Sequence, residues 1–176
     1  MAMFPIASQT VGVGGAAQVT FTNIPQNYTH LQVRVFGRGN TSFSEGLSTY
    51  VHINQDGSNS YSWHRLRGNG ASAFSDAGST TSVAAFGATV GDTGVTNVFG
   101  SLILDILDYA NTAKYKTFKG IGGVDRNGSG NTVLVSALWQ STAAINWLNF
   151  ETDSGLWLQG TRIDLYGITT SPVTGA

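Results

Sequence analysis

The sequence contains no cysteine, and this absence excludes disulfide bridges, thiolate metal sites and cysteine nucleophiles together. Charge is also scarce, because Lys, Arg, Asp and Glu make up only 11% of the 176 residues, whereas about a quarter is usual for globular proteins. The formal net charge is −1 and no run of Lys or Arg is present, so we expect no nucleic-acid partner. The polar surface must consist of Ser, Thr, Asn, Gln and Gly. Such a surface repels neighbouring molecules weakly, which suits either a protein covered in an assembly or an ordinary stable β-protein.

Long hydrophobic runs are lacking as well. The opening stretch, MAMFPIASQTVGVGG, has neither the charged and apolar regions of a signal peptide nor a membrane-spanning segment. We therefore expect synthesis in a cytoplasm and no membrane partner. Because this stretch is partly apolar and ends in glycines, residues 1–16 are predicted to form a flexible N-terminal arm. Phe4 and Ile6 are its candidate contacts to a partner.

The dominant pattern is an alternation of apolar and polar residues with period two. Leu31, Val33 and Val35 alternate with Gln32 and Arg34, as in a strand with one buried face. The segments TYVHIN and YSWHRL repeat the alternation on either side of a turn cluster, NQDGSNS. These segments predict consecutive antiparallel strands.

Two stretches are harder to interpret. Residues 67–97 are rich in Gly, Ser, Ala and Thr, and we predict a long, partly ordered excursion with one weak strand near residues 82–86. In residues 98–124, the apolar spacing of SLILDIL would also suit one face of a helix. Because Asn111 and Thr112 lie between two apolar runs, we predict strand, turn and strand.

The segment TRIDLYGI reads as the last strand of the fold. Ile163 and Leu165 are predicted to fill the core, while Arg162 and Asp164 face outward or pair across strands. Eight to ten short strands with regular turn signals and no helix predict an all-β fold, an antiparallel β-sandwich of the jelly-roll type. We place one domain at residues 17–170, followed by a C-terminal tail at residues 171–176.

Glycine patterns offer no cofactor site. The segments GVGGAA and GNGASA match the spacing of a dinucleotide-binding loop. That chemistry needs a helix N-terminus directly after the loop, to hold a pyrophosphate. Neither match precedes a predicted helix, so we interpret both as loop glycines and expect no cofactor.

Titratable residues offer no clear catalytic or metal site. His30, His52 and His64 lie on different predicted strands, without the converging ligands that zinc requires. Asp105 and Asp108 would lie on opposite faces of a strand, which does not make an acid–base pair; Lys116 is the candidate ion-pair partner. We therefore expect no metal and predict that the protein is not an enzyme.

Four tryptophans are candidate anchors. Trp63, Trp139, Trp147 and Trp157 are each candidates for core filling or for an interface, because tryptophan is enriched among the residues that contribute most to binding. With so few charges in the sequence, a self-association surface is one interpretation of this set.

Four blocks of sequence, in order, resemble a known domain. They are FTNIPQNYTHLQVRVFGRG, VHINQDGSNSYSWHRLRGNG, DILDYANTAKYKTFKGIGG and RIDLYGI. Together they are similar to a β-domain of tailed-bacteriophage virion proteins, familiar from phages of cyanobacteria and other aquatic bacteria. The resemblance runs from about Phe21 to Ile168, whereas the first twenty residues and residues 68–100 match least.

The resemblance implies structural roles and no active site. The residues to which it assigns such roles are Asn23 to Leu31, His64, Asp105, Asp108 to Asn111, Lys114, Lys116 and Leu165 to Ile168. It leads us to expect a capsid decoration (cement) protein, a homotrimer that binds the major capsid protein on the virion exterior and stabilises the shell. The alternative is a head- or tail-fibre tip that recognises host surface glycans through exposed aromatic residues and Asn, Asp and Ser loops.

Overall fold

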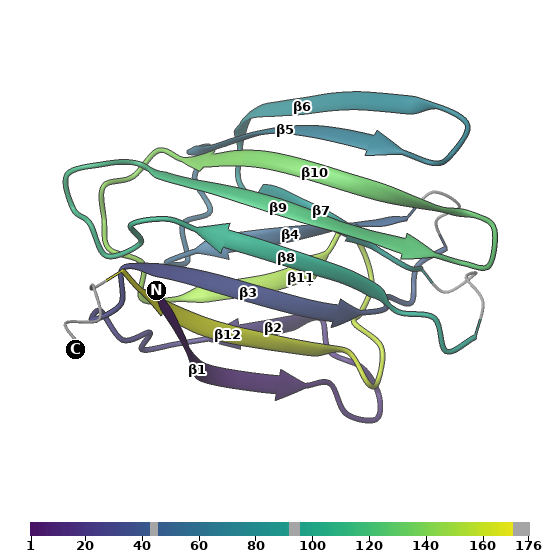
Figure 1. Cartoon of the computed structure of the whole chain (residues 1–176), viewed down its shortest axis with the longest axis horizontal. Coiled ribbons are helices and arrows are strands. Elements are labelled where there is room, and N and C mark those ends of the chain that lie inside the picture. Colours follow the sequence, from purple (N-terminus) through teal and green to yellow (C-terminus); the bar gives the residue numbers. More distant parts are fainter. Residues whose placement is uncertain (43–45, 92–95, 171–176) are drawn as a thin grey trace.

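The protein folds into two antiparallel β-sheets that pack face to face (Figure 1). The computed structural model describes residues 1–42, 46–91 and 96–170, and every regular element within these ranges is a strand. The larger sheet has the order β1 (Ala2–Thr10), β12 (Arg162–Thr169), β3 (His30–Gly37), β8 (Gly100–Ile106), β9 (Lys116–Asp125), β10 (Gly130–Trp139), β5 (Tyr61–Gly68), β6 (Ala73–Thr81). The smaller sheet has the order β2 (Gln18–Phe21), β11 (Leu148–Thr152), β4 (Leu47–Ile53), β7 (Ala84–Thr89). The predicted all-β, sandwich-like fold is confirmed.

The core lies between the sheets and follows the period-two pattern of the sequence. Leu31, Val33 and Val35 of β3 are buried, and β12 places Ile163 and Leu165 beside them in register. The segment that could also have been helical forms β8, a turn and β9, as predicted. Side chains that alternate with the core positions therefore lie on the outer face of the larger sheet.

The two sheets come very close where β7 passes over β9. All six residues of β7 are buried. A Cβ atom added at Gly120 of β9 would lie 1.9 Å from the carbonyl oxygen of Phe86 in β7. Only a residue without a side chain allows this approach, which explains one glycine of the GIGG segment.

The predicted flexible arm is not what the structure has. Instead of a free segment over residues 1–16, Ala2–Thr10 forms the edge strand β1, which pairs antiparallel with β12 from Ala2↔Thr169 to Thr10↔Arg162. The segment does not alternate strictly between apolar and polar residues, and the pairing register shifts next to Pro5. The sequence pattern therefore does not reveal this strand. Residues 171–176, the predicted tail, lie outside the described residues.

The predicted excursion over residues 67–97 is also corrected in part. This stretch contains the edge strand β6 and the buried strand β7, whereas only one weak strand was expected. Both strands are rich in small residues. β6 is mostly exposed and β7 is covered on both faces, so neither shows the alternation of a half-buried strand.

Candidate interaction surface

An apolar row crosses the outer face of the larger sheet. Ile103, Ile121, Leu134 and Leu66 come from β8, β9, β10 and β5 in that order, and each is paired directly with the next across the strands. Three of the four are about half exposed: 55% for Ile121, 46% for Leu134 and 53% for Leu66. We call these four residues the apolar row. The outer face of an antiparallel sheet is ordinarily polar, so four aligned aliphatic side chains require an explanation.

At each of its two ends, the row is followed by polar residues. Toward β1, the position in register after Ile103 is Arg34, and Asp164 follows it on β12. Asp164 accepts hydrogen bonds from Ser8 Oγ at 2.5 Å and from Arg162 Nε at 3.0 Å. Toward β6 the row ends at Ser75. The row is therefore bounded by polar side chains at both of its ends.

On one side, the apolar row is flanked by larger polar side chains. Gln32, Asp105, Lys119, Ser136 and His64 lie in register on β3, β8, β9, β10 and β5, and we call them the polar flank. Gln32 Nε2 donates to Asp105 Oδ1 at 2.9 Å. Lys119 is exposed, and in the described part of the chain it makes no ion pair shorter than 4 Å.

On the other side, the row is flanked by small side chains. Ser101, Gly123, Thr132 and Gly68 lie in register on β8, β9, β10 and β5, and we call them the small flank. A shallow hollow of about 620 Å³ lies over this flank, with Ile121, Leu134 and Leu66 in its wall. The polar flank has a smaller hollow of about 320 Å³, with Asp105, Lys119 and Ser136 in its lining. The apolar row therefore lies between a larger hollow and a smaller one.

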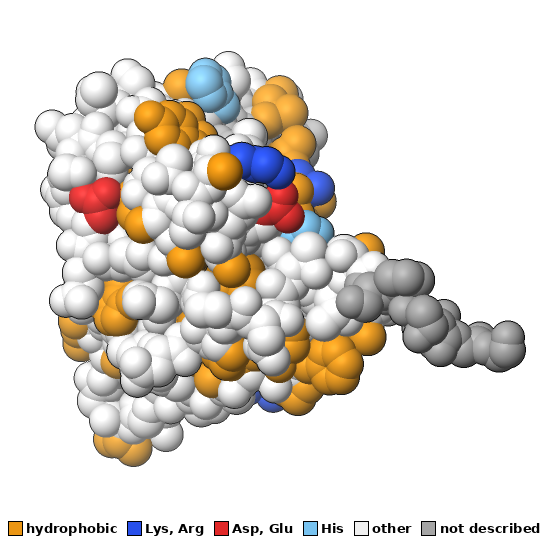
Figure 2. Space-filling model, turned by 90° about the vertical axis from the view of Figure 1, so that its left-hand side faces the viewer, with side chains coloured by type: hydrophobic (Ala, Val, Ile, Leu, Met, Phe, Trp, Pro, Cys, Tyr) orange, Lys and Arg blue, Asp and Glu red, His pale blue; other side chains and the backbone are white. Residues whose placement is uncertain are grey.

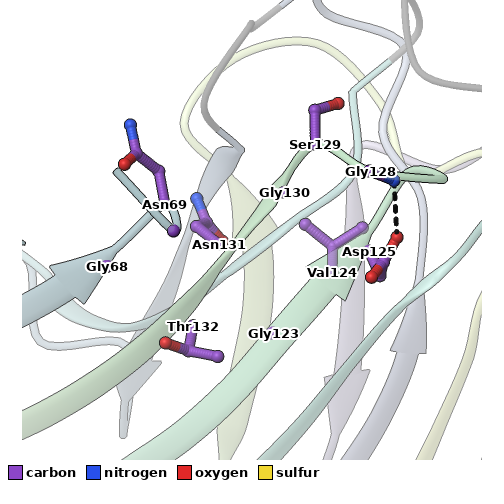
Figure 3. A pocket seen from close by; sticks show the side chains of 11 residues that line it. Gly68, Asn69, Gly123, Val124, Asp125, Gly128, Ser129, Gly130, Asn131 and Thr132 are labelled. Atoms are coloured by element: carbon purple, nitrogen blue, oxygen red, sulfur yellow. Dashed lines mark hydrogen bonds between the residues drawn. The ribbon is translucent and has the colours of Figure 1, made fainter. Parts of the chain in front are cut away.

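A second hollow of about 610 Å³ continues from the small flank to the loops at that end of the sheet. Figure 3 shows Asn69 and Ser129 on the loops around it and Asp125 at the end of β9, with Gly68, Gly123 and Thr132 in its floor. The Asp125 carboxylate accepts backbone hydrogen bonds from Asn127 at 2.7 Å and from Gly128 at 3.3 Å. The first hollow shares Gly68, Gly123 and Thr132 with it, so the two form one continuous depression.

Two of the predicted tryptophan contacts lie inside the protein. Trp157 is fully buried and donates its indole N–H to Phe150 O at 3.0 Å. Trp139 is 2% exposed and donates its indole N–H to Asp56 Oδ2 at 2.7 Å. The interface interpretation is therefore wrong for these two residues, because a side chain enclosed by the core offers no surface to a partner.

Trp63 and Trp147 are only partly buried. Trp63 packs over Gly78 of β6, and the Arg65 guanidinium lies 5.3 Å from its ring centre. Trp147 donates its backbone N–H to Asn54 Oδ1 at 3.2 Å. Neither residue belongs to the apolar row or its flanks.

Phe4 and Ile6 belong to strand β1 and not to a free arm. Phe4 is 45% exposed and packs against the ring of Tyr28, with ring centres 6.1 Å apart. Tyr28 in turn covers Gly167, where a Cβ would lie 2.3 Å from the tyrosine ring. Ile6 is partly buried against the core. The structure therefore ties both residues to the sandwich and leaves part of Phe4 open.

The titratable residues form small groups of two or three side chains. Glu151 Oε1 lies 2.9 Å from His52 Nε2, and this hydrogen bond lowers the pKa of Glu151. Lys114 Nζ lies 3.0 Å from Asp108, and it lowers the pKa of that carboxyl group. His64 is exposed on the polar flank. Among the described residues, no three His, Asp or Glu side chains come close enough to hold a metal ion.

Lys116 is not the ion-pair partner of the aspartates that the sequence suggested. It is 1% exposed, and its ammonium group donates to the carbonyl oxygens of Asn111 at 2.6 Å, Lys114 at 2.9 Å and Thr142 at 3.1 Å. Burial lowers its pKa. The ion pair with Asp108 is made by Lys114 instead, two residues earlier in the same turn.

Sequence reasoning missed the apolar row. Its members are spread over four strands that are far apart in the chain, and only the pairing register aligns them. One signal was available, because the segments SLILDIL and NTVLVSALW place apolar residues on both faces of their strands. A strand of that kind is covered on both sides or belongs to an exposed apolar surface.

Comparisons with known proteins give no family for this chain. No family model, no curated protein and no solved structure matches it. In the described part of the chain, no helix has the length and apolar character needed to cross a membrane.

Proposed function

We propose that this chain is a non-enzymatic structural protein of a virion, a decoration protein that binds the outer capsid surface and stabilises the shell. The observation that carries the proposal is the apolar row on an open sheet face of a protein with only 11% charged residues. Figure 2 shows a different side of the molecule, one end of the sandwich, where Lys, Arg, Asp and Glu side chains are also few. Exposed aligned apolar residues are typical of surfaces that bind other proteins.

The strand pairing supports a jelly-roll interpretation of the sandwich. If the hairpins β5–β6 and β9–β10 are set aside, eight strands remain. They pair first with last (β1 and β12), second with seventh (β2 and β11), third with sixth (β3 and β8) and fourth with fifth (β4 and β7). This is the pairing of one long antiparallel hairpin rolled into two sheets, the architecture found in viral capsid proteins and lectins. In this interpretation, the two hairpins are insertions that widen the larger sheet.

The inserted hairpins bear most of the candidate surface. Ile121, Leu134 and Leu66 of the apolar row lie on β9, β10 and β5, and only Ile103 lies on a strand of the basic roll. The part of the fold that exceeds a simple jelly roll is therefore the part that presents the row. This coincidence supports a role for the row in assembly.

A homotrimer on local threefold positions of the shell is the assembly we propose. Three linked copies multiply weak contacts to the major capsid protein through avidity. Contacts across the seams between capsomers must then break before the shell opens, which shifts the equilibrium toward the intact particle. Net charge near zero permits this crowding of copies.

Reconstitution on stripped particles tests this proposal. Particles freed of the chain should become stable to higher temperature when the purified protein is added back, and binding should saturate at a fixed ratio to the major capsid protein. Bound protein that leaves the particle's opening temperature unchanged would contradict a cement role.

A glycan-binding fibre tip remains the second candidate, and the hollow in Figure 3 is the observation that favours it. Asn69, Asp125 and Thr132 offer hydrogen-bonding groups there, and the 37%-exposed ring of Phe74 lies beside it, next to Gly68 and Asn69. Hydroxyl-rich ligands bind to such groups beside an aromatic ring. A glycan array that detects binding which is lost in Phe74→Ala would favour this function over the first.

A further inference from the structure

We infer that the apolar row is covered by a second copy of this chain, in an arrangement whose symmetry axis runs parallel to the row. This inference uses the proposed function only in treating the outer face as a protein–protein surface. It concerns the purified protein alone, so it stands or falls independently of any capsid.

The first argument is the shape of the face. The polar flank, which includes Gln32, Asp105 and Lys119, lies on one side of the row, and the small flank with Gly123 and Gly68 lies on the other. A rotation about an axis parallel to the row brings the polar flank of one copy against the small flank of the next. The longer side chains of each copy then enter the hollow of about 620 Å³ of its neighbour. This match holds for a twofold axis, because two sheet faces cover each other fully only in a pair.

The second argument is charge. Such a rotation keeps every strand opposite its own equivalent, so Lys119 on β9 of one copy faces Gly123 on β9 of the other. Asp125 lies two residues beyond Gly123 on the same face of that strand. Lys119 is exposed and makes no ion pair in the described part of its own chain. A lysine side chain spans about two residues of a strand, so Lys119 of one copy reaches Asp125 of the other. Within one copy these two residues form no ion pair.

The third argument concerns the apolar row itself. Cross-strand aliphatic pairs stabilise a sheet whether or not a partner covers them, so the row alone does not require a second copy. The neighbouring hollow, floored by Gly68 and Gly123, adds nothing to the sheet. Its place is explained if it receives the polar flank of another molecule, with sheets packed in the aligned way that is common for β-sandwiches.

Oligomeric state is the first test, measured by sedimentation velocity over a range of protein concentrations. The wild-type protein should sediment as an oligomer, and Leu134→Lys should sediment as a monomer with an unchanged melting temperature, because the residue is already 46% exposed. Val13→Lys is the matched control, since Val13 is 88% exposed and lies away from the row; it should remain oligomeric. A monomeric wild type, or an oligomer that survives Leu134→Lys, would overturn the inference.

Cysteine cross-linking tests how the two copies are arranged. Because the sequence contains no cysteine, each introduced cysteine is the only thiol in its chain. Strand β10 should face β10, so Leu134→Cys should form disulfide-linked pairs by itself. Ser136→Cys and Thr132→Cys lie on opposite flanks and should cross-link efficiently only when the two proteins are mixed. Equal cross-linking of each variant alone and in the mixture would mean random collision and would overturn the proposed arrangement.

Filling the hollow is an independent check. Gly68 has an ordinary backbone conformation, and a Cβ there would lie 3.7 Å from Thr132 Oγ1, so a larger side chain is compatible with the fold. Gly68→Gln should weaken self-association at least tenfold without lowering the melting temperature. Unchanged association would show that the hollow receives nothing from a second copy.

Discussion

At Gly120, a residue of β9, the two sheets come very close. Its missing side chain lets the Phe86 carbonyl of β7 approach to a position 1.9 Å from where a Cβ would stand. The contact involves backbone, which cannot turn away as a flexible side chain can. We therefore expect Gly120→Ala to force the sheets apart and to reduce the free energy of unfolding by about 1–3 kcal/mol, measured by chemical denaturation.

Gly57 provides the matched control for this substitution. No atom lies within 4 Å of the position a Cβ would take, and Gly57 does not have the positive φ that favours glycine. Gly57→Ala should be neutral or should stabilise by up to about 1 kcal/mol, through the lower entropy of the unfolded chain. Equal losses in both variants would contradict the close approach of β7 and β9.

At the scale of elements, Lys116 links two loops at one end of the sandwich. Its ammonium group donates to carbonyl oxygens of Asn111 and Lys114 in the turn before β9, and of Thr142 in the connection from β10 to β11. Lys116→Met keeps the apolar stem and leaves these carbonyl groups without this donor. We expect a loss of about 1–3 kcal/mol in the free energy of unfolding, measured by urea denaturation.

Lys114→Met is the control from the same turn. Its side chain is 64% exposed, and its partner Asp108 is 40% exposed. An exposed ion pair of this kind contributes little, so the loss should stay within about 0.5 kcal/mol. If the two lysine variants lost the same stability, the buried ammonium group would not be the connection between the loops.

The smaller sheet has a pH-sensitive link between its strands. Glu151 on β11 accepts from His52 on β4 at 2.9 Å and from Gln18 on β2 at 3.2 Å, and these contacts lower the pKa of Glu151 from 4.5. Because the carboxylate form is favoured in the folded state, its contribution is complete above pH 4.5 and is lost as pH falls through the lowered folded pKa.

Glu151→Gln should therefore be less stable than the wild type by about 1 kcal/mol or less at neutral pH. The difference should shrink as pH falls below about 4.5. Urea denaturation of both proteins at a series of pH values between neutral and about 3 measures this. A difference that stays constant over the whole series would show that Glu151 does not make these contacts.

Strands with one buried face could be predicted from the sequence, whereas the others could not. The sequence predicts β3 because every second residue is apolar, namely Leu31, Val33 and Val35. β7, with the sequence AAFGAT, is buried on both faces and has no alternation, and β1 is an exposed edge strand interrupted by Pro5. These strands form through pairing partners far away in the chain, and a local pattern does not contain that information.

At the scale of the whole molecule, the candidate surface depends entirely on strand order. Ile103 and Leu66 are separated by two strands in space but belong to distant parts of the sequence. The sequence does indicate a surface with few charges. Its four candidate contact tryptophans, however, include Trp139 and Trp157, which are buried in the core. An aromatic residue reports its burial only once its neighbours are known.

The central claim is that this protein is a decoration protein present all over a capsid. The most direct test is the copy number of the chain in purified virions whose genome encodes it. Quantitative mass spectrometry measures this number relative to the major capsid protein. A decoration protein that occupies repeated symmetric positions predicts a fixed ratio of about one, or about one-half. A ratio of a few per cent would contradict the claim and point to a fibre tip, and absence from the particles would rule out both virion roles.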